Sequence, residues 1–379
     1  MDQYQLCIIK IKQLHIYQRT PMKIIATHLF NDYSGSPKVL MQLLKGWNKH
    51  GITTQLYTCA GREGFLSDLP DVKYSFFNYR FAANPVIRFV NLMVSQIILC
   101  VKILKNTENT DIIYVNTVLP FGAAVAGKLK GNRVIYHIHE TSMKPAILKS
   151  FLFGIVEWCA TDIVYVSNYL ADQESFSNKK MHVLHNAIEN EFLSKAEADA
   201  IEKEGLSNVL MVCSLKTYKG INEFVQLSNC LPHHNFRLVL NANKNEIADY
   251  FKKVKLPENL EIFETQSNVH PFYKWADVVL NLSKPNEWVE TFGLTIIEGM
   301  AYGNPAIVPP VGGVTEVIEN GVNGFTLDSD DIVEIANKIG VWTSNDNYFK
   351  SFRKSARSAV AQYNEDRFIL KNIQILETK

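Results

Sequence analysis

The chain has 379 residues, of which 47% are apolar and 20% are charged, and its formal net charge is +1. This composition is that of an ordinary globular protein and excludes collagen-like and intrinsically disordered chains. The near-neutral charge argues against a protein built around nucleic acid, which carries a concentrated basic surface. Because the length exceeds what one hydrophobic core usually supports, we expect two domains.

The first 21 residues lack the small-residue cleavage site and clean apolar core of a secretory signal. Met22 opens a segment with the pattern of the first strand of an α/β domain. We therefore expect residues 1–21 to be an extension without a role in the fold and Met22 to be the natural start; a short ordered addition is the alternative. The six cysteines form no C-x-x-C pair, which favours a reducing compartment over a disulfide framework or a zinc site.

Short runs rich in isoleucine and valine alternate with helical patterns, which predicts parallel sheets covered by helices on both faces. The expected strands are 23–26, 54–58, 112–116, 134–139, 163–167 and 183–185 in a first series, and 209–214, 237–241, 260–263, 278–282 and 306–308 in a second. A polar segment at 194–207 separates the two series. We expect two Rossmann-like doubly wound domains, residues 22–192 and 206–359, with a C-terminal helix at about 360–379 that packs back on the first.

Residues 85–105 predict a long and mostly apolar helix, in which Arg88, Asn91, Ser95 and Lys102 fall on one face. We favour a core helix with one polar stripe. The alternative is a surface that meets a membrane or a lipid acceptor. The charge distribution is compatible with that alternative, because residues 1–191 hold 20 Lys and Arg against 14 Asp and Glu.

A glycine turn at residues 32–37 follows the first strand. Gly35 at a strand-to-helix turn lets backbone N–H groups approach a phosphate closely, with help from the helix dipole. Ser36 suits an N-cap, and Pro37 suits the first helical position. There is no G-x-G-x-x-G, which argues against a dinucleotide-dependent oxidoreductase.

Two histidines lie at the end of the expected strand 134–139, and Glu140 follows them. Ligands of open α/β sheets bind outside the carboxyl ends of the strands, and His137 and His139 share one face of this strand. We weigh a site role and a structural role equally. No comparable cluster of cysteines or carboxylates accompanies the pair, so we do not predict zinc.

The strongest signal lies at residues 284–324. Glu290 precedes a turn at Gly293 where a helix begins, and Glu298 lies one to two turns inside that helix. The turn and the helix N-terminus offer backbone donors to an anion, and Glu298 can accept the two hydroxyls of a ribose. Lys219 follows the first strand of the second domain, where it can counter a diphosphate. The alternative for each carboxylate is a capping or surface role.

These motifs together resemble glycosyltransferase family 4, the retaining "group 1" transferases of GT-B architecture. The resemblance covers nearly all of residues 22–379 and is most specific in the C-terminal part. It rests on the E-x7-E pair Glu290 and Glu298 with F-G-L intact, Gly312-Gly313 with Glu316, residues 321–324, the Gly35 turn, His139, and residues 185–188 in the place of the family's P-N-G-V/I.

The resemblance implies roles for the matched residues. His139 and Glu290 would act at the reacting centre, beside the transferred sugar. The residues that would bind the donor through ribose, diphosphate or sugar are Gly35, Lys219, Phe292, Gly293, Leu294 and Glu298. Further candidates are Ser214, Lys216, His137 and Asn186.

Two positions depart from the family pattern. Ser214 stands where the family usually has arginine, five residues before the motif lysine. Lys216 can substitute for it only as a point charge. Ala187 replaces a glycine, which is milder. We expect no metal and no cofactor, because residues 328–330 mimic a D-x-D but lie where carboxylates cap a helix.

We therefore predict a cytoplasmic enzyme, peripheral on the inner face of the cell membrane, without a nucleic-acid partner. It would move a sugar from a UDP- or GDP-sugar to a lipid-linked or saccharide acceptor in cell-surface polysaccharide biosynthesis (capsule, O-antigen or exopolysaccharide). The alternatives are a nucleotide-sugar epimerase of the same architecture and an inactive homologue acting as a binding subunit. The intact E-x7-E with F-G-L favours transfer over the epimerase. The presence of His139, Lys219, Glu290 and Glu298 argues against the inactive homologue, whose only support is Ser214.

Overall fold

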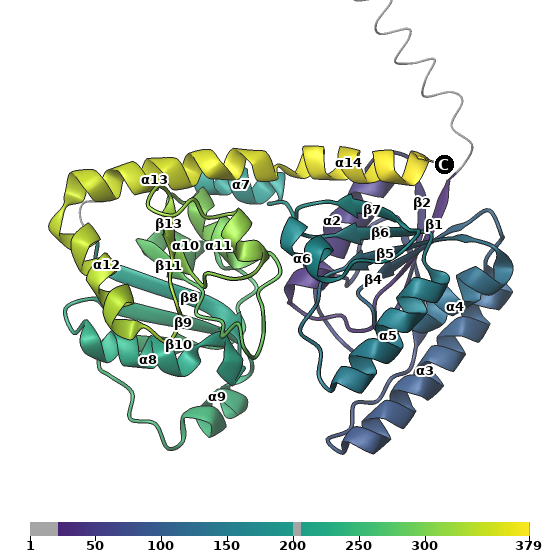
Figure 1. The fold of residues 1–379 in the computed structure, drawn as a ribbon, viewed down its shortest axis with the longest axis horizontal. Helices are drawn as coiled ribbons and strands as arrows, with labels where there is room; N and C mark the ends of the chain where they lie inside the picture. Colours follow the sequence, from purple (N-terminus) through teal and green to yellow (C-terminus); the bar gives the residue numbers. More distant parts are fainter. Residues whose placement is uncertain (1–21, 200–205, 379) are drawn as a thin grey trace, which may run out of the picture.

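The computed structural model describes residues 22–199 and 206–378. The expectation for residues 1–21 lies outside this range. Two parallel sheets, each with helices on both faces, form two lobes that face each other (Figure 1). This arrangement confirms the predicted α/β class with two Rossmann-like domains.

The N-terminal sheet has the strand order β3-β2-β1-β4-β5-β6-β7, all parallel. Its strands are β1 (Lys23–Thr27), β2 (Thr53–Cys59), β3 (Val72–Phe77), β4 (Ile112–Asn116), β5 (Arg133–Ile138), β6 (Asp162–Tyr165) and β7 (Lys180–Val183). Its helices are α2 (Gly35–Lys49), α3 (Pro85–Asn106), α4 (Phe121–Lys130), α5 (Ala146–Cys159) and α6 (Asn168–Gln173), and α7 (Asn190–Ala198) leads out of the lobe.

The C-terminal sheet has the order β10-β9-β8-β11-β12-β13, also parallel. Its strands are β8 (Asn208–Ser214), β9 (Asn235–Asn241), β10 (Leu260–Phe263), β11 (Val278–Leu280), β12 (Ala306–Val308) and β13 (Gly324–Thr326). Its helices are η1 (Thr217–Lys219), α8 (Ile221–Cys230), α9 (Lys244–Phe251), α10 (His270–Trp275), α11 (Leu294–Ala301), η2 (Gly313–Glu316) and α12 (Ile332–Ser344). The chain ends with α13 (Asp346–Val360), η3 (Ala361–Tyr363) and α14 (Glu365–Glu377).

Three local expectations need correction. The edge strands β3 and β13 were not expected, because β3 mixes buried and exposed residues and β13 is only three residues long. The strand expected at 183–185 is β7 at Lys180–Val183, another edge strand with little burial. Helix α2 begins at Gly35 with Ser34 as its N-cap residue, and not after Ser36, because the Asp32 carboxylate accepts the Ser34 N–H at 2.9 Å and turns the chain earlier.

The last two helices form a strap across both lobes (Figure 1). Helix α13 packs against α11 of the C-terminal lobe, and α14 packs against α2 of the N-terminal lobe. The buried side of α14 repeats at helical spacing through Phe368, Asn372 and Leu376. At Gly46 of α2 an added Cβ would lie 2.5 Å from the Ile369 side chain, so this glycine allows the two helices to approach closely.

A chain of buried hydrogen bonds joins α14 to the sheet beneath it. Trp47 donates from its indole nitrogen to the Asn372 side chain at 2.9 Å, and Asn372 donates to the Tyr114 hydroxyl at 3.1 Å. Tyr114 in turn bonds to Nδ1 of His137 at 3.0 Å. Asn372 is fully buried, so these bonds stand in for water that cannot reach the site.

Helix α3 contradicts the interpretation as a core helix with a polar stripe. Its buried side includes Ser95 and Gln96, and Gln96 accepts the Gly122 N–H of α4 at 3.0 Å. Its exposed side carries valines and isoleucines instead. Among the described residues α3 alone is long and apolar enough to cross a membrane, yet only 28% of its most apolar window is buried. The helix is therefore a surface element that buries Ser95 and Gln96 and leaves a row of apolar side chains exposed.

The Asn372 chain yields a stability prediction. We expect Asn372→Ala to lower the free energy of unfolding by about 2–4 kcal/mol, because it leaves buried donors and acceptors without partners. Urea unfolding followed by circular dichroism measures this loss. Lys371→Ala, an exposed change on the same helix, should stay within about 0.5 kcal/mol of the parent chain. Equal losses in the two variants would contradict the role of the hydrogen-bond chain.

Candidate functional site

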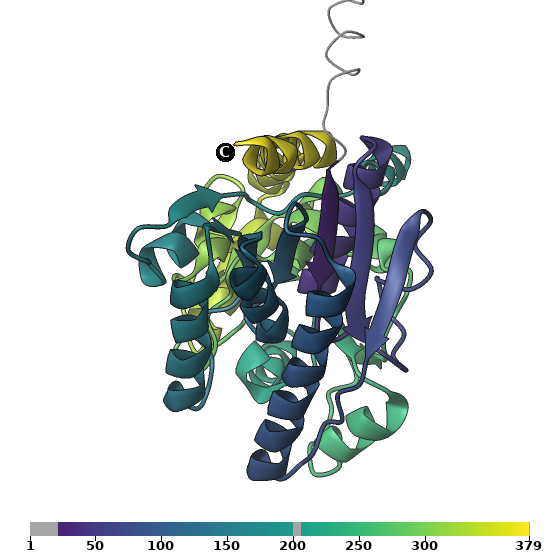
Figure 2. The same cartoon turned by 90° about the vertical axis from the view of Figure 1, so that its right-hand side faces the viewer.

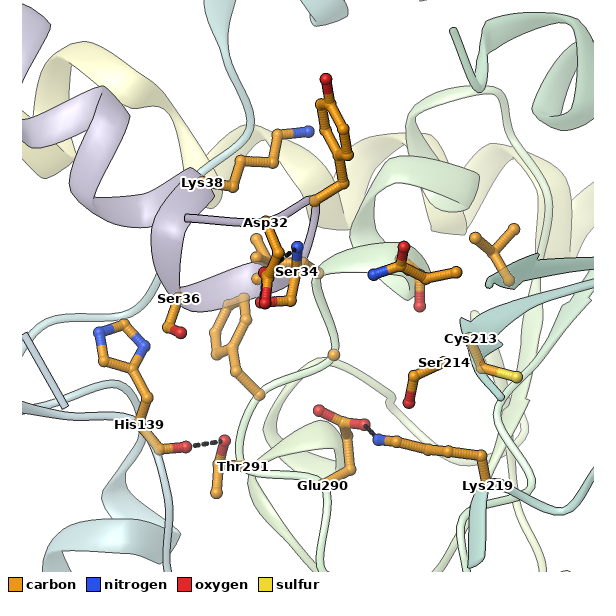
Figure 3. A pocket seen from close by; sticks show the side chains of 18 of the residues that line it. Asp32, Ser34, Ser36, Lys38, His139, Cys213, Ser214, Lys219, Glu290 and Thr291 are labelled. Carbon is orange, nitrogen blue, oxygen red and sulfur yellow. Dashed lines mark hydrogen bonds and ion pairs between the residues drawn. The ribbon is translucent and has the colours of Figure 1, made fainter. Parts of the chain in front are cut away.

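A cleft of about 970 Å³ lies between the lobes, lined by residues of both (Figure 3). The N-terminal lobe contributes the turn before α2 and the loop after β5. The C-terminal lobe contributes the loops after β8 and β11 and the start of α11. These are the carboxyl ends of parallel strands, where open α/β sheets bind their ligands.

Glu290 and Lys219 form a partly buried ion pair in the cleft. The Lys219 Nζ lies 2.8 Å from Glu290 Oε2, and the Asn281 amide donates to the same oxygen at 3.2 Å. Lys219 follows β8, and Asn281 follows β11, the neighbouring strand in the sheet. The strand order thus brings both partners to the carboxylate, although they lie far apart in the sequence.

Both members of this pair are charged. Burial by itself would raise the pKa of Glu290, but Lys219 and Asn281 outweigh burial and hold that pKa below its ordinary value. Burial would likewise lower the pKa of Lys219, yet the adjacent Glu290 carboxylate raises it above its ordinary value. The site therefore holds one fixed cation beside one fixed anion at neutral pH.

The N-termini of α2 and α11 meet at the cleft. Gly35 begins α2, and an added Cβ there would lie 3.2 Å from Leu294, the first residue of α11. Gly293 precedes α11 with φ of 94°, and an added Cβ would lie 2.8 Å from Val314. The backbone N–H groups and dipoles of two helices thus face one cavity, which suits it for an anion.

Glu298 links the two lobes. Its Oε1 lies 2.6 Å from Lys38 Nζ on α2, and its Oε2 accepts the Tyr273 hydroxyl at 2.8 Å. Burial opposes the charge on Lys38, but Glu298 and Glu189 raise the pKa of the lysine above its ordinary value. Each Glu298 oxygen has a further lone pair, so the carboxylate can still accept a ligand hydroxyl.

His139 is held as a neutral ring in a defined tautomer. The Asn116 amide nitrogen donates to the Ser36 carbonyl at 3.0 Å, which directs its oxygen to His139 Nε2 at 2.9 Å. Nε2 must then carry the proton, and Nδ1 is left as an acceptor. Burial, with His137 and His28 nearby, lowers the pKa of His139 well below its ordinary value. A neutral acceptor can hydrogen-bond to a hydroxyl of a ligand in the cleft.

Glu140 lies next to this histidine and also lines the cleft. Its carboxylate oxygens accept the backbone N–H groups of Val118 and His139, each at 3.1 Å. Burial raises the pKa of Glu140 to about 7, with these N–H bonds acting in the opposite direction. The carboxyl therefore titrates near neutral pH.

Two of the candidate residues lie outside the cleft. His137, a residue of β5, is fully buried and bonded to Tyr114, and burial lowers its pKa to about 3, so it acts as a neutral core residue. Lys216 is exposed and does not line the cavity, whereas Lys219, the last residue of η1, does. Lys216 therefore does not replace the family's arginine.

The other candidates all line the cleft. They are Gly35, His139, Asn186, Ser214, Lys219, Glu290, Phe292, Gly293, Leu294 and Glu298. The sequence reasoning missed Lys38, Asn116 and Tyr273, whose partners lie more than twenty positions away and are visible only after folding. Asn281 falls inside the strand expected at 278–282, but β11 ends at Leu280, which places Asn281 just after the strand.

The lobes touch through further hydrogen bonds around the cleft. Thr291 donates to the His139 carbonyl at 2.7 Å, and the Val289 N–H donates to Ser142 at 2.9 Å. On another side Glu316 accepts the Tyr169 N–H at 2.7 Å and lies 2.9 Å from His185 Nε2. Burial opposes ionisation of Glu316, but these donors lower its pKa to about 2. The cleft is thus flanked by direct contacts between the lobes.

Across the described part of the chain, no three His, Cys, Asp or Glu side chains gather so that they could hold a metal ion. The segment 328–330 resembles a D-x-D motif only in sequence. Asp330 pairs with Lys284 at 3.3 Å, and Asp331 caps α12 through the Glu334 N–H at 3.0 Å, so the cap lies one residue after the expected carboxylates.

Two family models together match most of the chain. Residues 33–192 match the model described as Glycosyltransferase Family 4, and residues 194–359 match the model described as Glycosyl transferases group 1. These ranges correspond to the N-terminal lobe and to most of the C-terminal lobe.

Curated relatives are similar over a large part of the chain. The N-acetyl-alpha-D-glucosaminyl L-malate synthase of Bacillus anthracis is 24% identical over 275 residues, which cover 67% of this chain and 70% of that protein. An uncharacterized 41.2 kDa protein in the cps region of Klebsiella pneumoniae is 25% identical over 214 residues, covering 50% of this chain and 57% of that protein.

Solved structures share the fold over almost the whole chain. HepE of Anabaena, crystallised with UDP and glucose, superposes with a TM-score of 0.76 at 18% identity, covering 94% of this chain and 100% of that one. The sucrose-phosphate synthase of Thermosynechococcus elongatus gives a TM-score of 0.77 at 16% identity, covering 94% and 98%. This chain is a glycosyltransferase with the GT-B fold. The two lobes of this glycosyltransferase are its paired Rossmann-like domains, and the cleft between them is its candidate active site.

The titration of Glu140 gives a prediction for the glycosyltransferase. Its pKa rises from an ordinary 4.5 to about 7 on folding, so the folded state keeps a proton that the unfolded state has lost in this range. The free energy of unfolding should therefore fall by about 3 kcal/mol as the pH rises across this window. Urea unfolding at several pH values measures the slope.

The matched variants separate this effect from the background titration. Glu140→Gln should flatten the slope, whereas Glu157→Gln, an exposed change on α5, should leave it as in the parent chain. An unchanged slope in Glu140→Gln would refute the assignment.

Proposed function

We propose that this glycosyltransferase takes a sugar from a UDP-sugar or GDP-sugar donor. It transfers that sugar to the acceptor with retention of configuration at the sugar carbon. The observation that carries the proposal is the cleft in which Lys219, Glu290 and two helix N-termini face one cavity. One fixed cation and two positive helix ends suit a diphosphate, and the adjacent carboxylates suit hydroxyl groups.

The donor fits the cleft in one direction. The diphosphate lies at the N-termini of α11 and α2, beside Gly293, Gly35 and Lys219. The ribose diol bonds to Glu298, and the sugar lies between Glu290 and His139. The crystallised neighbour HepE, whose structure holds UDP and glucose, supports a nucleotide-sugar donor through its shared fold. The family resemblance assigns the same roles to these residues.

We take retention from the family resemblance, and the state of the carboxylates bears on how it would be achieved. Glu290 is paired with Lys219, and Glu298 is paired with Lys38, so neither is free to attack the sugar carbon. We therefore assign a front-face reaction, in which the acceptor hydroxyl attacks from the side of the leaving diphosphate and that phosphate takes the proton. Lys219 and the helix N-termini stabilise the charge on the leaving group without a metal. Contacts between the lobes exclude water and limit hydrolysis of the donor.

For the acceptor we propose a lipid-linked or saccharide hydroxyl in the assembly of a cell-surface polysaccharide, on the cytoplasmic side of the membrane. The similarity to a protein of a cps region supports this assignment. The acceptor enters from the N-terminal lobe, because Met143 and Leu148 line the cleft on that side.

Isothermal titration with UDP, GDP, ADP and CMP tests the donor assignment. We expect one nucleoside diphosphate to bind, with an affinity that magnesium does not change. Glu298→Gln keeps the shape of the side chain and a hydrogen bond to Tyr273 but removes a charged acceptor. It should weaken that affinity by about tenfold or more.

The control for this measurement is Glu319→Gln, an exposed carboxylate of the same lobe, which should bind like the parent chain. If none of the four nucleotides binds, the proposed donor class is wrong. If magnesium is required, the metal-independent route is wrong.

A further inference from the structure

One face of helix α3 exposes an apolar stripe to solvent. Val86, Val90, Val94, Ile97 and Val101 recur at helical spacing and are between 43% and 70% exposed. Ser95 and Gln96 of the same helix are buried, together with Leu92, Leu99 and Ile103. Gly122 of α4 allows the two helices to approach closely, because a Cβ there would lie 2.1 Å from the Gln96 carbonyl. The helix therefore has apolar side chains on its buried side and a second apolar stripe that faces solvent.

The stripe continues onto α5. Phe89 of α3 and Phe151 of α5 are in contact, with ring centroids 6.3 Å apart, and both are partly exposed. Ile147, in the first turn of α5, is 79% exposed. Figure 2 shows α3 running along the outer face of the N-terminal lobe, with α5 on the same face. We call this surface, formed by the exposed apolar side chains of α3 and α5, the α3–α5 face.

The charges around the α3–α5 face are mostly positive. Residues 72–159 contain ten Lys and Arg against four Asp and Glu. Of the four acidic residues, Asp111 is buried in a pair with Lys23, and Glu140 lies in the cleft. Glu108 and Glu157 are left on the surface, while Arg133 and Lys149 pair with Asp162 and Glu174. Exposed apolar side chains within a basic surround match the chemistry of an anionic lipid surface.

The α3–α5 face borders the mouth of the cleft. Lys144 and Leu148 line the cavity, and Ile147 lies between them in the sequence, exposed on the outer side of α5. A molecule that lies on the α3–α5 face can therefore extend a head group into the active site without leaving that surface.

We propose that the α3–α5 face docks this enzyme on an anionic bilayer and presents the cleft to a lipid-linked acceptor held there. This rests on the proposed function and specifies its acceptor side. Helix α3 lies in the interface plane, with its valines and isoleucines among the acyl chains and the surrounding lysines and arginines at the lipid phosphates. A second copy of the chain fits this face poorly, because two basic surfaces would oppose each other.

Vesicle flotation of the full-length protein tests the docking. We expect the chain to float with vesicles of equimolar phosphatidylcholine and phosphatidylglycerol, to release them as NaCl is raised, and to ignore phosphatidylcholine alone. The double variant Val90→Ser with Ile97→Ser should lower the partition coefficient by at least about tenfold. The double variant Lys105→Glu with Lys128→Glu, at two exposed positions, should also lower the partition coefficient, because it replaces positive charges that attract the anionic lipid with negative ones.

The matched control is Val333→Ser with Val341→Ser, which removes two exposed valines from α12 of the other lobe. It should float like the parent chain. Nucleotide titration of every variant should be unchanged, which separates docking from donor binding. The proposal is overturned if the parent chain ignores anionic vesicles, or if the α3 variant floats equally well. It is also overturned if light scattering shows a dimer that the α3 variant breaks, because a second copy then covers the face.

Discussion

The partly buried ion pair between Lys38 and Glu298 is the contact on which the geometry of the site depends. It joins α2 of one lobe to α11 of the other, the two helices whose N-termini face the cleft. Removing two charges from water is costly, and such a pair stabilises a fold only when other polar groups complete it. Tyr273 and Glu189 supply them here. The same carboxylate is our candidate for the ribose, so closure of the lobes and donor binding share one residue.

The strap formed by α13 and α14 connects the two lobes and helps to hold them in their relative positions. It returns the end of the chain to the first lobe, where Asn372 completes a buried hydrogen-bond chain that includes His137. Arg133 reinforces it by donating to the Leu376 carbonyl at 2.7 Å while it pairs with Asp162. The histidine that looked like a site residue thus serves the core, and its neighbour His139 is left to face the ligand.

The two sides of helix α3 have different roles, one in folding and one, as we propose, in function. Folding needs its inward side, where Gln96 satisfies the Gly122 N–H of α4. The apolar side chains on the outward side do not contribute to the core. Contiguous exposed apolar surface generally marks an interaction site. The basic surround and the adjacent cleft mouth make a bilayer the partner whose chemistry fits.

The sequence by itself determined the α/β class, the two-domain order and the residues of the E-x7-E cluster, because these rest on local periodicity and short spacing. The cleft positions of Gly35, Lys219 and Glu290 follow from strand ends that are readable in the chain. Only the tertiary structure decided that Lys38 reaches Glu298, that Lys216 lies outside the cleft, and that α3 buries Gln96 while its valines face solvent. These outcomes depend on contacts between segments that are distant in the sequence. The hydrophobic pattern of a helix predicts which residues share a face, but it does not predict which face packs against the rest of the protein.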